Sequence, residues 1–266
     1  MLRRDDLMNG YTIWQDTELF CFGIDAVLLA HYPALKGGDR ILDLGCGFAP
    51  IPLILHAEAR KRGLLLREGS GRAGKSGGIH ITGLELQDAA AQIARRSVIE
   101  NGLERDIDIV TGDILEAGEL FAPASFSLIT CNPPYMPASD GLRAEKEARA
   151  IARTELSCTL EDVIRAASRL LKLRGRFALV HRPFRLPELF RLLGAYHLEP
   201  KRMRLVYPDR DAKPSMVLME AVKGGRPHLV TEPPLLIYEK DRSYTKEIYR
   251  IYGWDTVPGG NTDRES

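Results

Sequence analysis

The sequence has 266 residues, of which 44% are hydrophobic and 27% charged, and its formal net charge is +1. These values are typical of a globular protein with one α/β domain and exclude a disordered chain. The four cysteines are dispersed, the six histidines form no ligand motif, and neither a signal peptide nor a membrane-spanning run is present, so we predict a cytoplasmic protein without disulfides, metal or membrane segment.

The first 38 residues are predicted to form an N-terminal extension that packs on the core. Asn9-Gly10 marks a turn, and residues 11–15 are expected to pair as a short strand. Asp25 stands before an apolar run and is a plausible helix start. Phe22 and Asp25 flank the motif that follows, and both are expected to reach a bound cofactor.

A buried strand over 40–44 is followed by a Gly-Cys-Gly turn and then by a helix over 50–60. Gly45 and Gly47 lack a Cβ atom, so a ligand can approach the backbone closely there. Asp43 lies at the tip of the strand. The pattern differs from a dinucleotide-binding fingerprint, because proline occupies the position of the third glycine.

Residues 61–78 are rich in Gly, Arg and Ser and are predicted to form a flexible insertion. Within them, residues 69–76 match the phosphate-loop pattern G-x-x-x-x-G-K-S. That pattern needs a buried strand before it and a helix N-terminus after it, whereas a strand is expected to follow here. A nucleotide-triphosphate-binding protein that binds RNA is therefore only a remote alternative.

The next predicted strand, 79–84, is followed by Glu85, whose carboxylate can accept hydrogen bonds from both ribose hydroxyls of an adenosine ligand. Glu85 lies 42 residues after Asp43, or 24 when the 18-residue insertion is removed, close to the usual spacing of about 20. An amphipathic helix over 88–101 and a strand over 107–110 come next. Asp113 then follows, placed to accept from an adenine amino group, with Ile114 beside the ring.

The apolar run 126–131 predicts a buried strand that ends at Asn132-Pro133-Pro134-Tyr135, because proline cannot donate to a strand ladder. The Asn132 side-chain oxygen and the Pro133 carbonyl, here called the acceptor pair, can accept both protons of a planar NH₂ group. Tyr135 offers a face on which the ring can stack. The alternative is a strand followed by a proline turn without a binding role.

The segment 136–153 is predicted to be a lid or substrate loop. The remaining predicted elements are a capped helix from Thr159 to about 173, a strand, another helix and a final antiparallel strand pair, at 159–173, 176–180, 186–196, 198–207 and 215–223. Together these elements predict a core domain over 39–223. The tail 224–266 contains a tyrosine-rich piece, and its end from about 255 is expected to be disordered.

Charge is distributed unevenly along the chain. Residues 1–164 carry 17 basic and 24 acidic residues, whereas residues 165–213 carry 13 basic and 4 acidic residues, a net charge of +9. Such a block can bind a phosphate backbone, so we predict a basic RNA-binding surface within 143–213. The alternative is a solvated helix face, since Arg165, Arg169 and Lys172 have helical spacing.

The glycine turn and the Asn-Pro-Pro-Tyr motif resemble those of class I S-adenosylmethionine-dependent methyltransferases. Nearly the whole chain is similar to the bacterial tRNA1(Val) adenine N6-methyltransferases. The segments that carry this more specific resemblance are Asp6 to Gly10, Phe20 to Ala30, Asn132 to Tyr135, Cys158 to Val163 and His181 to Pro183.

The resemblance implies a Rossmann-like α/β fold with a seven-stranded, mostly parallel sheet, helices on both faces and an antiparallel C-terminal strand pair. It implies methyl transfer from S-adenosylmethionine to the exocyclic N6 of the adenosine at tRNA position 37. The residues implied in catalysis are Asn132, Pro133, Pro134 and Tyr135. Those implied in cofactor binding are Phe22, Asp25, Asp43, Gly45, Cys46, Gly47, Glu85, Leu86, Asp113, Ile114 and Asn132.

Two other methyltransferase activities share the tetrapeptide. One is methylation of a glutamine side-chain amide on a translation release factor, and the other is amino-group methylation of a different rRNA or tRNA site. The release-factor enzymes carry a sizeable helical N-terminal domain, whereas only about 40 residues precede the first core strand here. The sequence does not indicate an oligomeric state.

Overall fold

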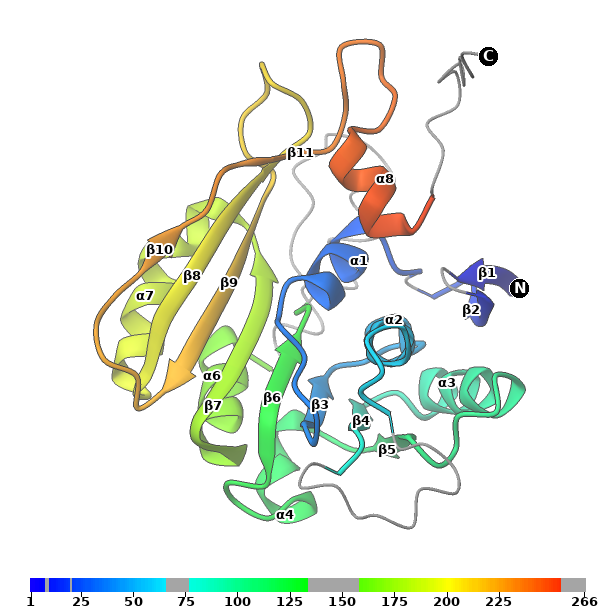
Figure 1. Ribbon diagram of the computed structural model, residues 1–266. Coiled ribbons are helices and arrows are strands. Elements are labelled where there is room, and N and C mark those ends of the chain that lie inside the picture. The colour runs from blue at the N-terminus through cyan, green and yellow to red at the C-terminus, as the bar shows by residue number, and fades with distance from the viewer. Residues whose placement is uncertain (8–9, 20, 66–76, 134–157, 255–266) are drawn as a thin grey trace.

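The computed structural model describes residues 1–7, 10–19, 21–65, 77–133 and 158–254. In this part of the chain a nine-stranded sheet has helices on both faces (Figure 1). Along the sheet the strands follow the order β10-β8-β9-β7-β6-β3-β4-β5, and β11 also pairs with β8. Their bounds are β3 Arg40–Leu44, β4 His80–Glu85, β5 Ile107–Thr111, β6 Phe126–Cys131, β7 Leu171–His181, β8 Leu198–Tyr207, β9 Met216–Lys223, β10 Val230–Thr231 and β11 Leu235–Leu236.

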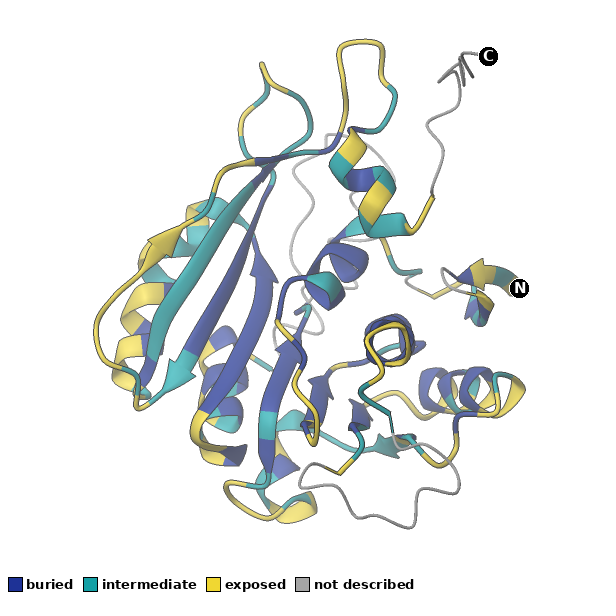
Figure 2. Ribbon diagram, in the orientation of Figure 1, coloured by how far each residue is buried: buried dark blue, intermediate teal, exposed yellow. Residues whose placement is uncertain are grey.

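Two hydrophobic cores form because successive residues of the central strands point to opposite faces. In β3, Ile41 belongs to one core and Leu42 to the other. The first core is covered by α1 (Ile24–His31), α2 (Pro50–Lys61) and α3 (Asp88–Glu100), and the second by α4 (Ala117–Leu120), α6 (Leu160–Leu170) and α7 (Leu186–Ala195). The central strands are accordingly buried on both faces (Figure 2).

The predicted core strands and helices are all present, and the mostly parallel sheet with an antiparallel pair, β8 and β9, is confirmed. The helix predicted over 159–173 ends at Leu170, and residues 172–175 lie inside β7 as a bulge, where the pairing jumps from Phe126↔Leu171 to Leu128↔Arg176. Arg174 has a φ of 66° there. In the described part of the chain, the elements that were not predicted are β1 (Leu2–Leu7), η2 (Ile114–Glu116), α4, η3 (Pro183–Arg185), β10, β11 and α8 (Lys246–Tyr252).

The N-terminal hairpin, formed by β1 and β2 (Tyr11–Asp16), is tied to the helices that cover the first core. The Tyr11 hydroxyl lies 2.8 Å from His56 Nδ1 on α2, and the backbone N–H of Trp14 donates to Ser97 Oγ on α3. The Trp14 ring also holds the Arg96 guanidinium, 3.6 Å from the ring centroid. The extension is thus fastened to α2 and α3 by side chains rather than by the main sheet.

A backbone hydrogen bond between Leu64 and Ile79 holds the two ends of the predicted insertion together. The backbone N–H of Ile79 donates to the Leu64 carbonyl at 3.4 Å, immediately before β4 begins. Most of the insertion, including the phosphate-loop-like residues 69–76, lies outside the described residues. Its junctions therefore meet at the N-terminal edge of the parallel strands.

A buried ion pair lies at the same edge. Arg176 Nη2 donates to Asp39 Oδ2 at 2.8 Å, and both side chains are less than a tenth exposed. Asp39 also accepts from the Ser127 hydroxyl at 2.7 Å and from the Lys36 backbone N–H at 2.8 Å. Arg176 further donates to the Ala34 carbonyl. Both carboxylate oxygens of Asp39 and both terminal nitrogens of Arg176 thus have protein partners, which a buried pair requires.

Asp39→Ala should lower the free energy of unfolding by about 3–5 kcal/mol, because it leaves the buried Arg176 guanidinium without its counter-charge. Arg3→Ala is the control, since it breaks an exposed ion pair with Asp5 and should cost about 0.5 kcal/mol or less. Urea unfolding measures both values. Equal losses in the two variants would show that the buried pair has no special role.

Candidate active site

The candidate site lies at the carboxyl edge of the parallel strands. β3, β4, β5 and β6 run parallel and end at this edge, which places Gly45, Leu86, Gly112 and Asn132 directly beyond them. In open α/β sheets ligands bind outside this edge. The edge therefore brings together residues that are up to about ninety positions apart in the chain.

The glycine turn after β3 is held by the neighbouring strand. The backbone N–H groups of Gly45 and Cys46 both donate to the Leu84 carbonyl, at 2.9 and 3.0 Å. Gly45 and Gly47 have φ values of 73° and 56°, and no described atom lies within 4 Å of the position that a Cβ would take at either residue. The turn thus combines a backbone conformation that favours glycine with open space beside it.

Glu85 fixes the turn from the end of β4. Its Oε2 accepts from the Gly47 backbone N–H at 2.9 Å, and its Oε1 accepts from the Gln87 backbone N–H at 2.9 Å. A carboxylate has about four acceptor positions, so these two bonds leave capacity for the two hydroxyls of a ribose. The open glycine turn and this carboxylate fit the expected adenosine-containing cofactor.

Asp43 is a buried carboxyl group, 1% exposed, at the end of β3. The Thr130 hydroxyl donates to its Oδ1 at 2.6 Å, while Oδ2 has no hydrogen-bond partner among the described residues. Burial raises the pKa of Asp43 to about 7, Thr130 opposes that shift, and the Glu85 carboxylate adds to it. The sequence did not single out Thr130, which is recognisable only from its parallel register with Asp43.

Asn132 is oriented by a residue 107 positions earlier in the chain. Its Nδ2 donates to Asp25 Oδ2 at 3.0 Å. A carboxylate only accepts hydrogen bonds, so the amide NH₂ must face Asp25 and the amide oxygen must point elsewhere. That oxygen, Oδ1, is buried and has no hydrogen-bond partner in the described part of the chain. A buried acceptor without a partner is rare and marks a place where a ligand N–H can bind.

Asp25 itself is held in place from a second direction. Its Oδ1 accepts from the Ala26 backbone N–H in the first turn of α1, at 3.0 Å. The sequence predicted that Asp25 faces the cofactor. The structure places its Oδ2 against the Asn132 amide nitrogen, so its observed contact is with the residue that supplies one member of the acceptor pair.

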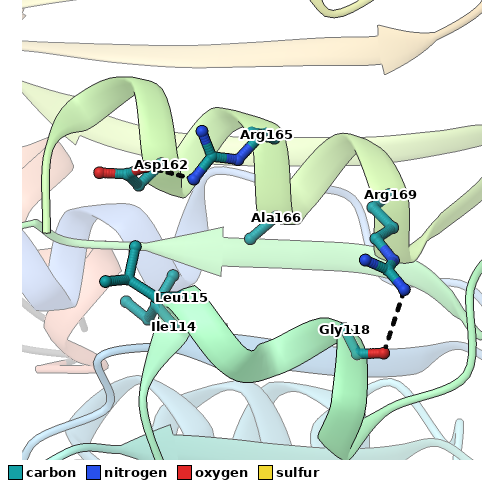
Figure 3. A pocket seen from close by; sticks show the side chains of 7 residues that line it. All are labelled: Ile114, Leu115, Gly118, Asp162, Arg165, Ala166 and Arg169. Atoms are coloured by element: carbon teal, nitrogen blue, oxygen red, sulfur yellow. Dashed lines mark hydrogen bonds and ion pairs between the residues drawn. The ribbon is translucent and has the colours of Figure 1, made fainter.

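Asp113 caps a short 3-10 helix, η2 (Ile114–Glu116), by accepting from the Leu115 backbone N–H at 2.9 Å. Beside it, a cavity of about 150 Å³ separates η2 and α4 from α6 (Figure 3). Its lining residues are Ile114, Leu115, Gly118, Asp162, Arg165, Ala166 and Arg169. Ile114 thus borders a hollow next to the expected adenine position, with two guanidinium groups on the far wall.

Several arginines of the predicted basic block are already engaged. In the cavity wall Arg165 pairs with Asp162, and Arg169 donates to the Gly118 carbonyl at 3.3 Å (Figure 3). Further ion pairs are Arg176 with Asp39, Arg185 with Glu188, Arg202 with Glu232, and Arg204 with Glu247. Acidic residues from outside the block therefore neutralise part of its charge, and a basic surface there stays a prediction.

The other predicted site residues differ in their environments. The Cys46 side chain is buried against Gly83, where a Cβ would lie 2.6 Å from the sulfur, and burial raises the pKa of its thiol. Leu86 is 49% exposed, and Phe22 is half-buried against the first core. Pro133 is buried, whereas Pro134 and Tyr135 lie outside the described residues. The functional roles of all these residues stay predictions.

Two negative findings concern the described residues alone. No group of three or more His, Cys, Asp or Glu side chains is placed there to hold a metal ion. No helix in the described ranges has the length and apolar character needed to cross a membrane.

Asp43→Asn should raise the melting temperature at pH 8, and the gain should vanish near pH 4. The folded-state pKa of about 7 lies above the ordinary value of 3.8, so the folded protein loses stability as pH rises through this window. The asparagine variant has no such loss, so its free energy of unfolding at pH 8 should exceed that of the wild type by on the order of 2–4 kcal/mol. Thermal unfolding between pH 4 and 8 measures it. The exposed Glu104→Gln is the control, and a difference from wild type that is independent of pH in Asp43→Asn would contradict the expectation.

Comparisons with known proteins agree with this geometry. A family model described as a methyltransferase domain matches residues 35–193. A crystal structure of an Agrobacterium tumefaciens protein, described as a predicted O-methyltransferase, superposes with a TM-score of 0.62 at 23% identity, over 86% of this chain and 95% of that one. This likeness confirms the Rossmann-like class I fold.

Curated relatives are more specific. The chain is 27% identical to a Bacteroides thetaiotaomicron protein over 90% of its own length and 94% of the relative, and 30% identical to a Dickeya chrysanthemi protein over 86% and 85%. Both are named tRNA1(Val) (adenine(37)-N6)-methyltransferase. The expected methyltransferase activity and S-adenosylmethionine cofactor are thereby supported. By these matches over most of its length, the chain belongs to the methyltransferase-domain family and, within it, to the tRNA1(Val) (adenine(37)-N6)-methyltransferases.

Proposed function

We propose that this protein methylates the exocyclic N6 of the adenosine at position 37 of a tRNA of the tRNA1(Val) type, with S-adenosylmethionine as methyl donor. The observation that carries the proposal is the buried, unpartnered Oδ1 of Asn132, oriented by Asp25 at the same sheet edge as Glu85 and the glycine turn. An acceptor in that setting fits an amine substrate. The relatives' names support adenine in tRNA as the amine.

Glu85 and the glycine turn would hold the cofactor. The two open glycine positions let a ligand lie against the backbone, and the remaining acceptor capacity of Glu85 suits ribose hydroxyls. When bound, S-adenosylmethionine supplies a methyl group on a positively charged sulfur.

Asn132 Oδ1 and the Pro133 carbonyl would accept the two N–H groups of the substrate amine. Holding both protons directs the nitrogen lone pair and stabilises the positive charge that develops on nitrogen as a bond to carbon forms. Asp25 acts as a positioning residue, because its hydrogen bond fixes which side of the amide faces the substrate. No strong general base is required, since positioning and charge stabilisation supply the rate.

The substrate nucleotide would have to leave the loop stack to reach a buried acceptor. An unpaired loop nucleotide does so at lower cost than a paired one. Residues 143–213 remain the proposed source of phosphate contacts. The arginines in this range that already form ion pairs contribute less positive charge to such contacts. A tRNA substrate implies a cytoplasmic enzyme.

Glu85→Gln should weaken binding of S-adenosylhomocysteine, the cofactor product, by about 1–3 kcal/mol, because a charged acceptor of ribose hydroxyls and of the Gly47 N–H is lost. Isothermal titration calorimetry measures the affinity. Glu119→Gln, an exposed substitution on α4, should bind normally. Wild-type affinity in a folded Glu85→Gln protein would remove Glu85 from the cofactor site.

Asn132→Ala should lower kcat by about 10²-fold or more while tRNA affinity changes little, because the lost contact matters most in the transition state. The assay is nucleoside mass spectrometry of tRNA incubated with labelled S-adenosylmethionine, which also identifies the methylated base. Gln92→Ala, an exposed amide on α3, is the matched control. Wild-type turnover in Asn132→Ala would overturn the acceptor mechanism, and label outside N6-methyladenosine would overturn the proposed substrate.

A further inference from the structure

Four aromatic side chains near the end of the described chain stack on one another. The ring centroids of Tyr238 and Tyr244 are 5.2 Å apart at 14°, those of Tyr244 and Tyr252 are 5.9 Å apart at 16°, and those of Tyr252 and Trp254 are 4.6 Å apart at 29°. Tyr249 packs edge-on against Tyr244. We call Tyr238, Tyr244, Tyr252 and Trp254 the aromatic stack.

The stack is built on a firmly held scaffold. An isolated β-bridge joins Tyr238 to Tyr244, and the Tyr238 backbone N–H donates to the Pro208 carbonyl at 2.8 Å. Thr245 caps α8 and donates to the Leu236 carbonyl at 2.7 Å. Ile248, on α8, is fully buried in the first core. The rings are therefore presented in a fixed arrangement, so binding to them need not order them first.

Both ends of the stack reach the surface. Tyr238 is 39% exposed and Trp254 is 46% exposed, whereas Tyr244 and Tyr252 are half-buried between them. Four exposed basic residues, Lys240, Arg242, Lys246 and Arg250, lie in the same segment as the rings, together with the exposed acidic residues Glu239 and Asp241. Of the acidic residues in the same segment, Glu247 is engaged by Arg204 through two bonds of 2.7 and 2.9 Å. Aromatic faces beside cations are the usual setting for unpaired nucleic-acid bases.

The stack lies close to the candidate active site. Helix α8 packs beside α1, the helix that carries Asp25 (Figure 1). The pKa of Tyr252 is raised by burial, by Tyr244 and Tyr238, and also by the Asp25 carboxylate, so this hydroxyl lies within electrostatic range of Asp25. Asp25 in turn binds Asn132. A nucleotide whose base reaches the acceptor pair would therefore have its chain neighbours near these rings.

We propose that the aromatic stack binds unpaired bases of an RNA loop next to the nucleotide that enters the active site. This inference rests on the proposed function, and it adds a substrate-binding surface outside the catalytic edge. Every base has a face that can stack, so the contact needs no particular sequence. It would favour an open loop over a duplex, because paired bases do not present their faces.

The test replaces the exposed rings one at a time, as Trp254→Ala and Tyr238→Ala. Affinity is measured for full-length tRNA, for an anticodon stem-loop and for a duplex RNA of similar length, each over a range of salt. Each variant should bind the two loop-containing RNAs about 5- to 100-fold more weakly, as loss of one stacked base typically does. The slope of log K against log salt should not change, because no phosphate contact is removed. Trp254→Phe and Tyr238→Phe should retain most of the affinity.

Phe190→Ala is the matched control, since Phe190 is 38% exposed and lies on α7, away from α8 (Figure 1). Affinity for stem-loop and tRNA that is unchanged in both alanine variants would overturn the proposal. Equal losses for duplex and loop RNA would overturn it too, because they would indicate a contact other than base stacking. Binding is read independently of methylation, so a wild-type protein that binds loop RNA through these rings but forms no N6-methyladenosine contradicts only the proposed function.

Discussion

Parallel pairing of β3 with β4 and β6 is the constraint on which the site depends. In this register Asp43 stands opposite Gly83 on one side and Thr130 on the other. A slip of one residue would turn each strand's side chains to the opposite face and separate Asp43 from Thr130. The same register brings the Leu84 carbonyl within hydrogen-bond distance of the glycine turn. The conformation of that turn therefore depends on the pairing of β3 with β4.

The bond between Asp25 and Asn132 joins this edge to the N-terminal part of the chain. Helix α1 buries Ala26, Val27, Leu28, Leu29 and Ala30, and this packing anchors the helix turn that carries Asp25, which accepts from Asn132 directly after β6. An amide held on one side by a carboxylate loses little freedom when its other side binds substrate. The extension before the main sheet thus has a direct part in the geometry of the acceptor pair, although it adds no strand to that sheet.

Much of this fold could be predicted from the sequence, because buried strands and amphipathic helices leave periodic patterns and the Asn-Pro-Pro-Tyr motif ends a strand abruptly. The partner of Asn132 could not, since the bond spans 107 residues and only tertiary structure reveals it. The net charge of residues 165–213, taken alone, leaves out their ion-pair partners Asp39, Glu232 and Glu247, which come from outside this block. The tyrosine-rich tail was visible in the sequence, but its stacking combines a loop and a helix and follows no single period.

The hydrogen bond between Leu64 and Ile79 has a consequence for how this chain tolerates change in length. The two junctions of the 66–76 segment are already adjacent, and they lie at the sheet edge opposite Asn132 and Glu85. For a flexible loop whose ends are held together, doubling its length costs only about 0.6 kcal/mol in closure entropy. The connection between α2 and β4 is therefore a suitable insertion site. A reporter peptide or an affinity tag can be inserted there, about the length of a strand away from the candidate active site.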